Sequence, residues 1–413
     1  MAPAYTLTDT LHLWWLQDPA TPRHVGTLRH VRRAGNQPAG VALSYADAWL
    51  ATGIPLSEDL PLQRGEFLPT EPDAAAGAVD DARPDRWGER VIRLIDRPPR
   101  LTTLEYLYFA GDGRFGALGV STSAEEYLPR RHGPLPDLAD AQAVHDLVRR
   151  VEAGEPVDEA LRRLVSPGAT LGGAKPKALI EMDGTPWIVK FGDAGEPTDS
   201  PLIEHAAMTL AARAGIEVCE TRALRLRDGH AVAVRRFDRD GAQRRHAMSA
   251  HVALRAAGEA YGYPELALLM RRRGPAERIA AQGEQLFRRM CFNILMDNTD
   301  DHEKNHALVV DAQQRLVLSP AFDLLPSGQA LGYQQMRVGR DGADSTLANA
   351  LSEHRAFALT RAEAERVCAE VATVVAGWAA HFRSTGVSPR DITLLTEQID
   401  RAFLREQRDQ AMR

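Results

Sequence analysis

The strongest constraint on the fold of this chain is an Asp-Gly pair between two short apolar runs. Asp183-Gly184 separates 178-ALIEM-182 from 186-PWIVKF-191. Such a pair predicts a β-hairpin, because both residues tolerate the positive φ angles of a two-residue turn. A second Asp-Gly pair at 228–229 again stands between apolar runs. We therefore expect two antiparallel hairpins in this part of the chain.

The segment between the two hairpins predicts a helix over residues 200–215. Ser200 suits an N-cap, Pro201 suits the first helical position, and Gly215 suits the position after the last turn. A helix between two hairpins indicates a mixed α/β fold. We expect an N-terminal α/β module over 1–127, a strand-rich region over 140–240, and a mainly helical region over 241–413.

The C-terminal region shows one clear apolar stripe before residue 297. Its members recur at spacings of three and four, as on one face of a helix: Phe287, Met290, Cys291, Ile294 and Leu295. After it, 306-HALVV-310 and 315-RLVLS-319 flank a polar turn and predict a short hairpin. Residues 355–413 are expected to form amphipathic helices.

Composition excludes several classes of protein. The net charge of the 413 residues is −6, so bulk electrostatics do not favour direct binding to nucleic acid. Three widely spaced cysteines, Cys219, Cys291 and Cys368, argue against a disulfide framework and fit a reducing compartment. No run of 18 apolar residues occurs. We expect a cytoplasmic protein with no membrane segment.

The stretch 297-DNTDDHEKNHALVV-310 allows two chemical interpretations. His302 and His306 fit the zinc-protease pattern H-E-x-x-H, with Asp323 as a possible third ligand. That pattern requires a continuous helix, whereas here it follows helix-breaking residues and precedes a β-type run. Zinc hydrolysis is therefore the remote alternative.

Phosphoryl transfer is the second interpretation, and it meets more of its requirements. In a kinase catalytic loop an Asp that orients the attacking hydroxyl precedes a metal-binding Asn by five residues. Asp300 and Asn305 keep this interval. The hairpin that follows leads to Asp323, a candidate second metal ligand. Upstream, Lys190 lies on a predicted strand and Glu204 on the next helix, in the order that a kinase requires.

Each of these parts also has an ordinary structural explanation. Lys190 could be an exposed residue of an edge strand, and Glu204 could complement the dipole of its helix. Gly172-Gly173 could be a simple turn, and Asp323 a turn residue. The glycine loop fits neither G-x-x-x-x-G-K-[ST] nor G-x-G-x-x-G. The ordered set is therefore more informative than any single member.

Segments along nearly the whole chain resemble the HipA-type toxin kinases of bacterial type II toxin–antitoxin systems. The resemblance rests on these segments: 60-LPLQRG-65, 83-RPDRWGERVI-92, 113-GRFGALGVS-121, 166-SPGATLGGAKPKALI-180, 233-AVRRFDR-239, 299-TDDHEKN-305 and 319-SPAFDLL-325. It implies an atypical, two-lobed protein-kinase-like α/β fold, with a mainly helical C-terminal lobe.

The resemblance also implies a role for each matching residue. Asp300 would be the catalytic base, and Asn305 and Asp323 would hold Mg²⁺. Glu204 would form an ion pair with Lys190. The remaining residues would bind ATP: Gly172, Gly173, Ala174, Lys175 and Lys177 in the phosphate loop, Lys190 at the phosphates, Arg235, Arg236 and Phe237 at the adenine hinge, and His302 in the catalytic loop.

The family's regulation and partners are further expectations. Thr170 occupies the position where the family autophosphorylates a serine and so switches itself off. Characterised relatives phosphorylate aminoacyl-tRNA synthetases, such as glutamyl-tRNA synthetase, and bind a small helix-turn-helix antitoxin, HipB, that holds operator DNA. A protein from another class, a catalytically weak co-repressor that works with its antitoxin, is the alternative.

Overall fold

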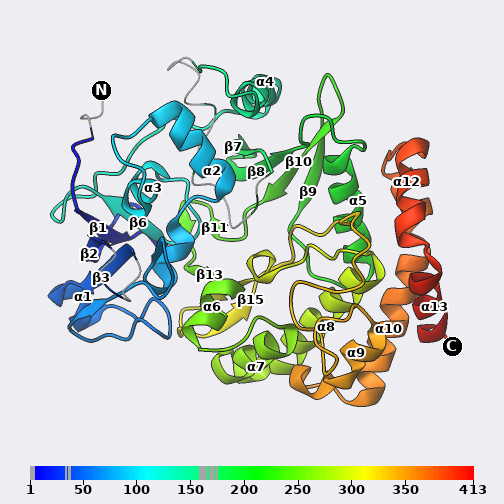
Figure 1. Ribbon diagram of the computed structural model, residues 1–413. Helices are drawn as coiled ribbons and strands as arrows, with labels where there is room; N and C mark the ends of the chain where they lie inside the picture. Colours follow the sequence, from blue (N-terminus) through cyan, green and yellow to red (C-terminus); the bar gives the residue numbers. More distant parts are fainter. Residues whose placement is uncertain are drawn as a thin grey trace. The chain divides into compact units, whose positions relative to one another are not determined.

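The computed structural model describes residues 5–32, 35, 39–157, 164, 167, 173 and 175–413. Two compact units make up the chain (Figure 1). Unit 1 comprises Met1–Ala194 and Arg236–Met248, and unit 2 comprises Gly195–Arg235 and Ser249–Arg413. Antiparallel strands and many helices confirm the expected mixed α/β class. The domain boundaries expected from the sequence stay predictions.

Unit 1 begins with a sheet in the strand order β4-β3-β2-β1-β6, with β5 paired to β3. Its elements are β1 (Thr10–Trp15), β2 (Arg23–Val31), β3 (Gly40–Tyr45), α1 (Asp47–Thr52), β4 (Glu66–Phe67), β5 (Ala74–Ala75), η1 (Gly77–Ala82), α2 (Arg86–Val91), η2 (Ile92–Asp96), α3 (Thr103–Phe109) and β6 (Leu118–Ser121). Leu11 and Leu13 of β1 are fully buried, as alternation on a half-buried strand requires.

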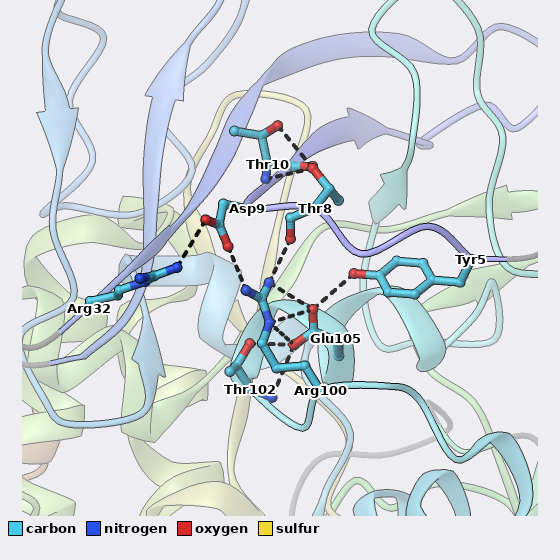
Figure 2. Close-up of polar contacts among 8 residues, drawn as sticks. All are labelled: Tyr5, Thr8, Asp9, Thr10, Arg32, Arg100, Thr102 and Glu105. Atoms are coloured by element: carbon cyan, nitrogen blue, oxygen red, sulfur yellow. Dashed lines mark hydrogen bonds and ion pairs between the residues drawn. The ribbon is translucent and has the colours of Figure 1, made fainter.

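A buried carboxylate fastens α3 to the segment before β1 (Figure 2). Glu105 accepts hydrogen bonds from Tyr5, Arg100 and Thr102, and Arg100 also reaches Asp9. Burial alone would raise the pKa of Glu105, but the hydrogen bonds from Arg100 and Thr102 outweigh burial and lower that pKa. Because its acceptors are occupied by protein donors, this cluster is structural.

The rest of unit 1 contains the first predicted hairpin. Its elements are η3 (Leu138–Asp140), α4 (Ala141–Glu152), β7 (Lys177–Met182), β8 (Thr185–Phe191), β11 (Arg239–Asp240) and β12 (Gln243–Arg244), with β13 (Ala247–Ser249) at the boundary of the units. Strands β7 and β8 pair antiparallel, and Asp183 and Gly184 have φ angles of 53° and 70°. The predicted hairpin is confirmed.

Unit 2 opens with α5 (Ser200–Arg213), which packs on the hairpin β9 (Thr221–Arg225) and β10 (His230–Arg235). The helix and the second hairpin are confirmed, with one correction. The N-cap is Asp199, so Ser200 is the first helical residue and Pro201 the second. The Ser200 hydroxyl instead donates to Glu196. Gly215, at φ 76°, follows the end of the helix as predicted.

Helices make up most of the remainder of unit 2. Its elements are α6 (Ala250–Ala256), α7 (Tyr263–Arg273), η5 (Ala276–Arg278), α8 (Ile279–Leu295), η6 (Glu303–Asn305), β14 (Ala307–Val310), β15 (Leu316–Leu318), α9 (Leu347–Ser352), η7 (His354–Phe357), α10 (Arg361–Ala376), α11 (Trp378–Ser384), α12 (Pro389–Ile399) and α13 (Ala402–Ala411). The predicted apolar stripe is buried on α8, which packs against α10. The predicted C-terminal helices are drawn in orange and red in Figure 1.

Two remaining expectations concern cysteines and membrane segments. All three cysteines are free and buried, and the sulfur atoms of Cys291 and Cys368 are 3.7 Å apart. Among the described helices, none combines the length and the apolar character that crossing a bilayer demands.

Candidate active site

The candidate catalytic loop of unit 2 starts where helix α8 ends. Asp297 has a φ angle of 56°, a left-handed conformation that reverses the chain after the last helical turn. The Asn298 amide donates to the Asn293 carbonyl at 2.9 Å, and the two side-chain amides are joined at 3.0 Å. The polar residues after the apolar stripe thus end the helix and define the direction of the loop.

Asp301 holds the loop through buried hydrogen bonds. Its carboxylate is fully buried, and it accepts hydrogen bonds from the Tyr263 hydroxyl and from Nε2 of His306 at 2.8 Å. Burial and the neighbouring Asp301 raise the pKa of Tyr263 well above its ordinary value, so the hydroxyl stays protonated and donates. Because Asp300 directly precedes this anchored residue, its backbone position is fixed on one side by Asp301.

The hairpin β14–β15 lies between Asn305 and Asp323 in the chain. Leu308 pairs with Leu318, and the Ser319 amide donates to the Ala307 carbonyl at 2.9 Å. In this antiparallel register the residues before β14 lie beside those after β15. Asn305, two residues before β14, and Asp323, five residues after β15, therefore both lie beyond the same end of the hairpin.

Asp323 has an uncommon backbone conformation. Its φ angle is 59°, which costs a non-glycine residue free energy and is found where the surroundings enforce it. The chain just before it is fixed to the segment between α5 and β9, because the Ala321 amide donates to the Glu217 carbonyl and Ala321 accepts from the Cys219 amide, each at 2.8 Å. Such strain is frequent at functional sites.

A second tie joins the segments that flank Asp300 and Asp323. The Ser327 amide donates to the Asp297 carbonyl at 3.1 Å, and the hydroxyl groups of Ser327 and Thr299 are 2.7 Å apart. Asp300 thus follows a segment that is fastened to the chain after Asp323. Together with the hairpin register, this places the three predicted residues in one small region of unit 2.

The zinc-protease geometry is not present in the same residues. Glu303–Asn305 form a single 3₁₀ turn, not the continuous α-helix that H-E-x-x-H requires. His306 is bound to Asp301, while Nδ1 of His302 accepts the Lys304 amide at 3.2 Å. Within the described part of the chain, no group of three or more His, Cys, Asp or Glu residues is arranged to hold a metal ion.

In unit 1, two of the predicted phosphate-binding lysines lie directly opposite each other. Lys177 of β7 is the cross-strand partner of Lys190 of β8. Opposite residues of an antiparallel pair point to the same face, where two like charges repel. Lys177 is buried, and its Nζ lies 2.8 Å from an Asp85 carboxylate oxygen. This pair offsets one of the two positive charges.

Arg236, a predicted hinge residue, belongs to a buried hydrogen-bond network. Its guanidinium binds both carboxylate oxygens of Asp238, at 2.8 and 2.6 Å, and the carbonyls of Gly113 and Arg114. Asp238 also accepts the Gly116 amide at 2.8 Å. Gly113, Arg114 and Gly116 are thereby joined to Arg236 and Asp238 within unit 1. The predicted contact of Arg236 with a nucleotide stays a prediction.

The other predicted residues are placed as follows. Phe237 packs edge-on against Phe115, with ring centroids 5.8 Å apart. Arg235 is exposed on β10 and lies 3.4 Å from Glu220. Glu204 is buried on α5 of unit 2, whereas Lys190 belongs to unit 1, so their ion pair stays a prediction.

The phosphate loop is described only in part. Gly173 has a φ angle of 101°, which only glycine adopts readily, and Lys175 is partly exposed. Thr170, Gly172 and Ala174 lie outside the described residues.

Sequence reasoning missed the buried partners, namely Asp85, Asp238, Asp301 and Tyr263. Asp85 stands before a helix like an N-cap, and Asp301 adjoins Asp300, but neither signal identifies a partner distant in the chain.

Two family models match the chain. The HipA-like C-terminal domain matches residues 169–378, and the HipA N-terminal domain matches residues 20–121. No curated protein matches the sequence.

Two solved structures are similar to this chain. HipA from a complex of Shewanella oneidensis MR-1 HipA, HipB and operator DNA is 17% identical, with a TM-score of 0.66 and 97% of each chain covered. The proinflammatory kinase CtkA of Helicobacter pylori is 14% identical, with a TM-score of 0.45, covering 60% of this chain and 94% of CtkA. The first likeness supports the fold.

The first family model alone spans half of the chain. We conclude that the chain belongs to the HipA family, whose motifs its sequence resembles.

Proposed function

We propose that the chain is an ATP- and Mg²⁺-dependent serine/threonine protein kinase that acts as the toxin of a type II toxin–antitoxin module. The proposal rests mainly on the candidate catalytic loop. Asp300 and Asn305 keep the kinase interval, Asp301 anchors the loop, and Asp323 lies at the same end of the hairpin as Asn305. Asp300 then acts as the base that accepts the proton of the attacking hydroxyl.

The residues of unit 2 fit a magnesium ion. Mg²⁺ in phosphoryl-transfer sites is bound by one or two carboxylates together with phosphate oxygens and water. Asn305 is buried, at 7% exposed. An amide oxygen can bind a metal ion, and Asp323, beyond the same end of the hairpin, has a backbone conformation of the kind found at functional sites. Asn305 and Asp323 would hold the ion, which would neutralise charge on the transferred phosphoryl group.

Most of the residues proposed to bind the nucleotide belong to unit 1, while Arg235 and His302 belong to unit 2. Lys190, beside the glycine-containing loop, would bind the phosphates. Lys175, Lys177 and the loop backbone at Gly173 would complete this grip. Arg235, Arg236 and Phe237 would border the adenine, through backbone groups where the side chains are engaged elsewhere, as that of Arg236 is. His302 would contact the nucleotide from the catalytic loop.

The test of this proposal is phosphoryl transfer from radiolabelled ATP. We expect the wild-type chain to transfer label in the presence of Mg²⁺ and to arrest growth when expressed. Asp300→Asn should abolish both, because an amide cannot accept the proton. Glu365→Gln, at an exposed carboxylate on α10, is the matched control and should keep both. Transfer or arrest retained by Asp300→Asn would refute the proposal.

Self-inhibition is a finer part of the proposal. We infer that Thr170 receives a phosphoryl group after incubation with ATP. A threonine keeps the hydroxyl that a serine would offer, although its branched methyl group should slow the transfer. Mass spectrometry should find the phosphate on Thr170 and none in Asp300→Asn. Phosphate at another residue only would refute the switch.

The partners are proposed from the family. The similar Shewanella structure contains HipB and operator DNA, and we propose a HipB-like helix-turn-helix antitoxin for this chain, with operator DNA bound mainly through it. An aminoacyl-tRNA synthetase, as in characterised relatives, is the proposed substrate. If the chain were only a co-repressor, wild type would bind the antitoxin but transfer no label, and Asp300→Asn would behave like wild type.

A further inference from the structure

The segment 83–92 lies against Lys177, at the base of the phosphate loop. Asp85 precedes helix α2, and its Oδ1 accepts the Gly88 amide at 2.8 Å as an N-cap. Its other oxygen, Oδ2, binds Nζ of Lys177 at 2.8 Å. One carboxylate thus caps a helix of the N-terminal module and holds a lysine of the phosphate loop.

Two further contacts join the same segments. Nε1 of Trp87 donates to the Lys177 carbonyl at 2.8 Å. A Cβ atom at Gly88 would lie 2.0 Å from the Pro167 carbonyl oxygen, so only glycine permits this approach. Both ends of the segment 167–177 therefore meet the start of α2.

The Lys177 ammonium also lies close to the loop itself. A Cβ atom at Gly173 would be 2.9 Å from Nζ of Lys177. Glycine at this position thus provides both the positive φ angle and the space for the ammonium group. The side chain of Asp85 is 3% exposed and that of Lys177 is 5% exposed, so water screens this pair weakly.

We propose that Asp85 is a positioning residue that fixes the Lys177 ammonium against the phosphate loop, so that the N-terminal module sets the affinity for nucleotide phosphates. The inference rests on the proposed function. Removing Asp85 would leave the buried Lys177 ammonium without this counter-charge. Lys177 also lies directly opposite Lys190, whose like charge repels it. Both the lost pairing and the repulsion favour displacement of the Lys177 side chain. The loop would then lose a fixed donor for phosphate.

The experiment compares ATP with adenosine, which lacks phosphates, by calorimetry. Asp85→Asn keeps an N-cap for α2 but loses the charge that pairs with Lys177. We expect the Kd for ATP to rise by roughly tenfold or more, the scale of one lost charge-assisted hydrogen bond, with the Kd for adenosine unchanged. Asp85→Glu should recover part of the affinity. Glu89→Gln, on the same helix in a partly exposed pair with Arg93, should change neither.

A double variant separates positioning from general damage. In Lys177→Met the lysine is already absent, so adding Asp85→Asn should weaken ATP binding no further. Additive losses would overturn the inference, as would an equal loss of adenosine affinity or unchanged ATP affinity in Asp85→Asn. Circular dichroism and thermal unfolding check that each variant is folded.

The two proposals fail in different ways. Wild-type protein that binds adenosine and ATP with equal affinity, or neither, would overturn the proposed function and this inference with it. Wild-type protein that binds ATP more tightly than adenosine, with no effect of Asp85→Asn, would overturn the inference alone.

Discussion

The candidate catalytic loop of unit 2 and the base of the phosphate loop in unit 1 are each held by a buried carboxylate, but the sequence distances differ. Asp301 binds His306, five residues away, and Tyr263, 38 residues away. Asp85 binds Lys177, 92 residues away. The contacts of Asp301 thus stay within unit 2 and within 38 residues, whereas the contact of Asp85 joins the base of the phosphate loop to the N-terminal module. Variants of the two anchors should therefore affect different properties.

The largest effect on the free energy of unfolding is expected at Asp301. Asp301→Ala removes the acceptor of two buried donors and leaves His306 and Tyr263 without it. We expect the free energy of unfolding to fall by about 3–5 kcal/mol, as for other broken buried pairs. Urea unfolding measures this, with Glu365→Gln as the exposed control. A loss below about 1 kcal/mol would show that the loop is held by other contacts.

In unit 1 we expect a buried histidine that contacts a distant segment to make the free energy of unfolding sensitive to acid. Burial lowers the pKa of His246 to about 4 from 6.5, and its ring binds the Leu56 carbonyl, 190 residues away. A histidine that is neutral when folded contributes stability above pH 6.5, and this is lost as the pH falls towards 4. The shift corresponds to roughly 3 kcal/mol.

His246→Gln provides the measurement for this pH dependence. Unfolding by urea at pH 7 and pH 4.5 should show a smaller loss of stability with acid for the variant than for the wild type. Equal losses in the two proteins would mean that His246 is not responsible.

The smallest effect is expected from Tyr263→Phe. The ring still packs, but the hydroxyl that donates to Asp301 is gone, so the free energy of unfolding should fall by about 2 kcal/mol. Because Asp300 adjoins Asp301, we also expect a lower kcat with little change in the KM for ATP. A changed KM with an unchanged kcat would separate Tyr263 from the catalytic loop.

The same contrast explains what could be predicted from the sequence. Both Asp-Gly hairpins, the apolar stripe of α8 and the hairpin after Asn305 follow from local patterns, and each is confirmed. The predicted N-cap of α5, Ser200, was wrong by one residue, because Asp199 and Ser200 both suit that position.

The partners of the buried charges could not be predicted in this way. The contacts of Lys177 with Asp85 and of Arg236 with Gly113 join segments more than ninety residues apart. Spacing carries no information on such contacts, since they depend on how the elements pack. The predicted roles of Asp300, Asn305 and Asp323 stay proposals, but the hairpin register and the contacts of Ser327 connect the segments that carry them.

The most direct test of this division of roles is steady-state ADP release, with kcat and the KM for ATP measured for two variants. Asp300→Asn should lower kcat by about 10³-fold and leave the KM for ATP nearly unchanged, because the base acts in the chemical step. Asp85→Asn should raise the KM for ATP and largely keep kcat. If both variants changed the same parameter, or if Asp300→Asn kept its kcat, the account would be contradicted.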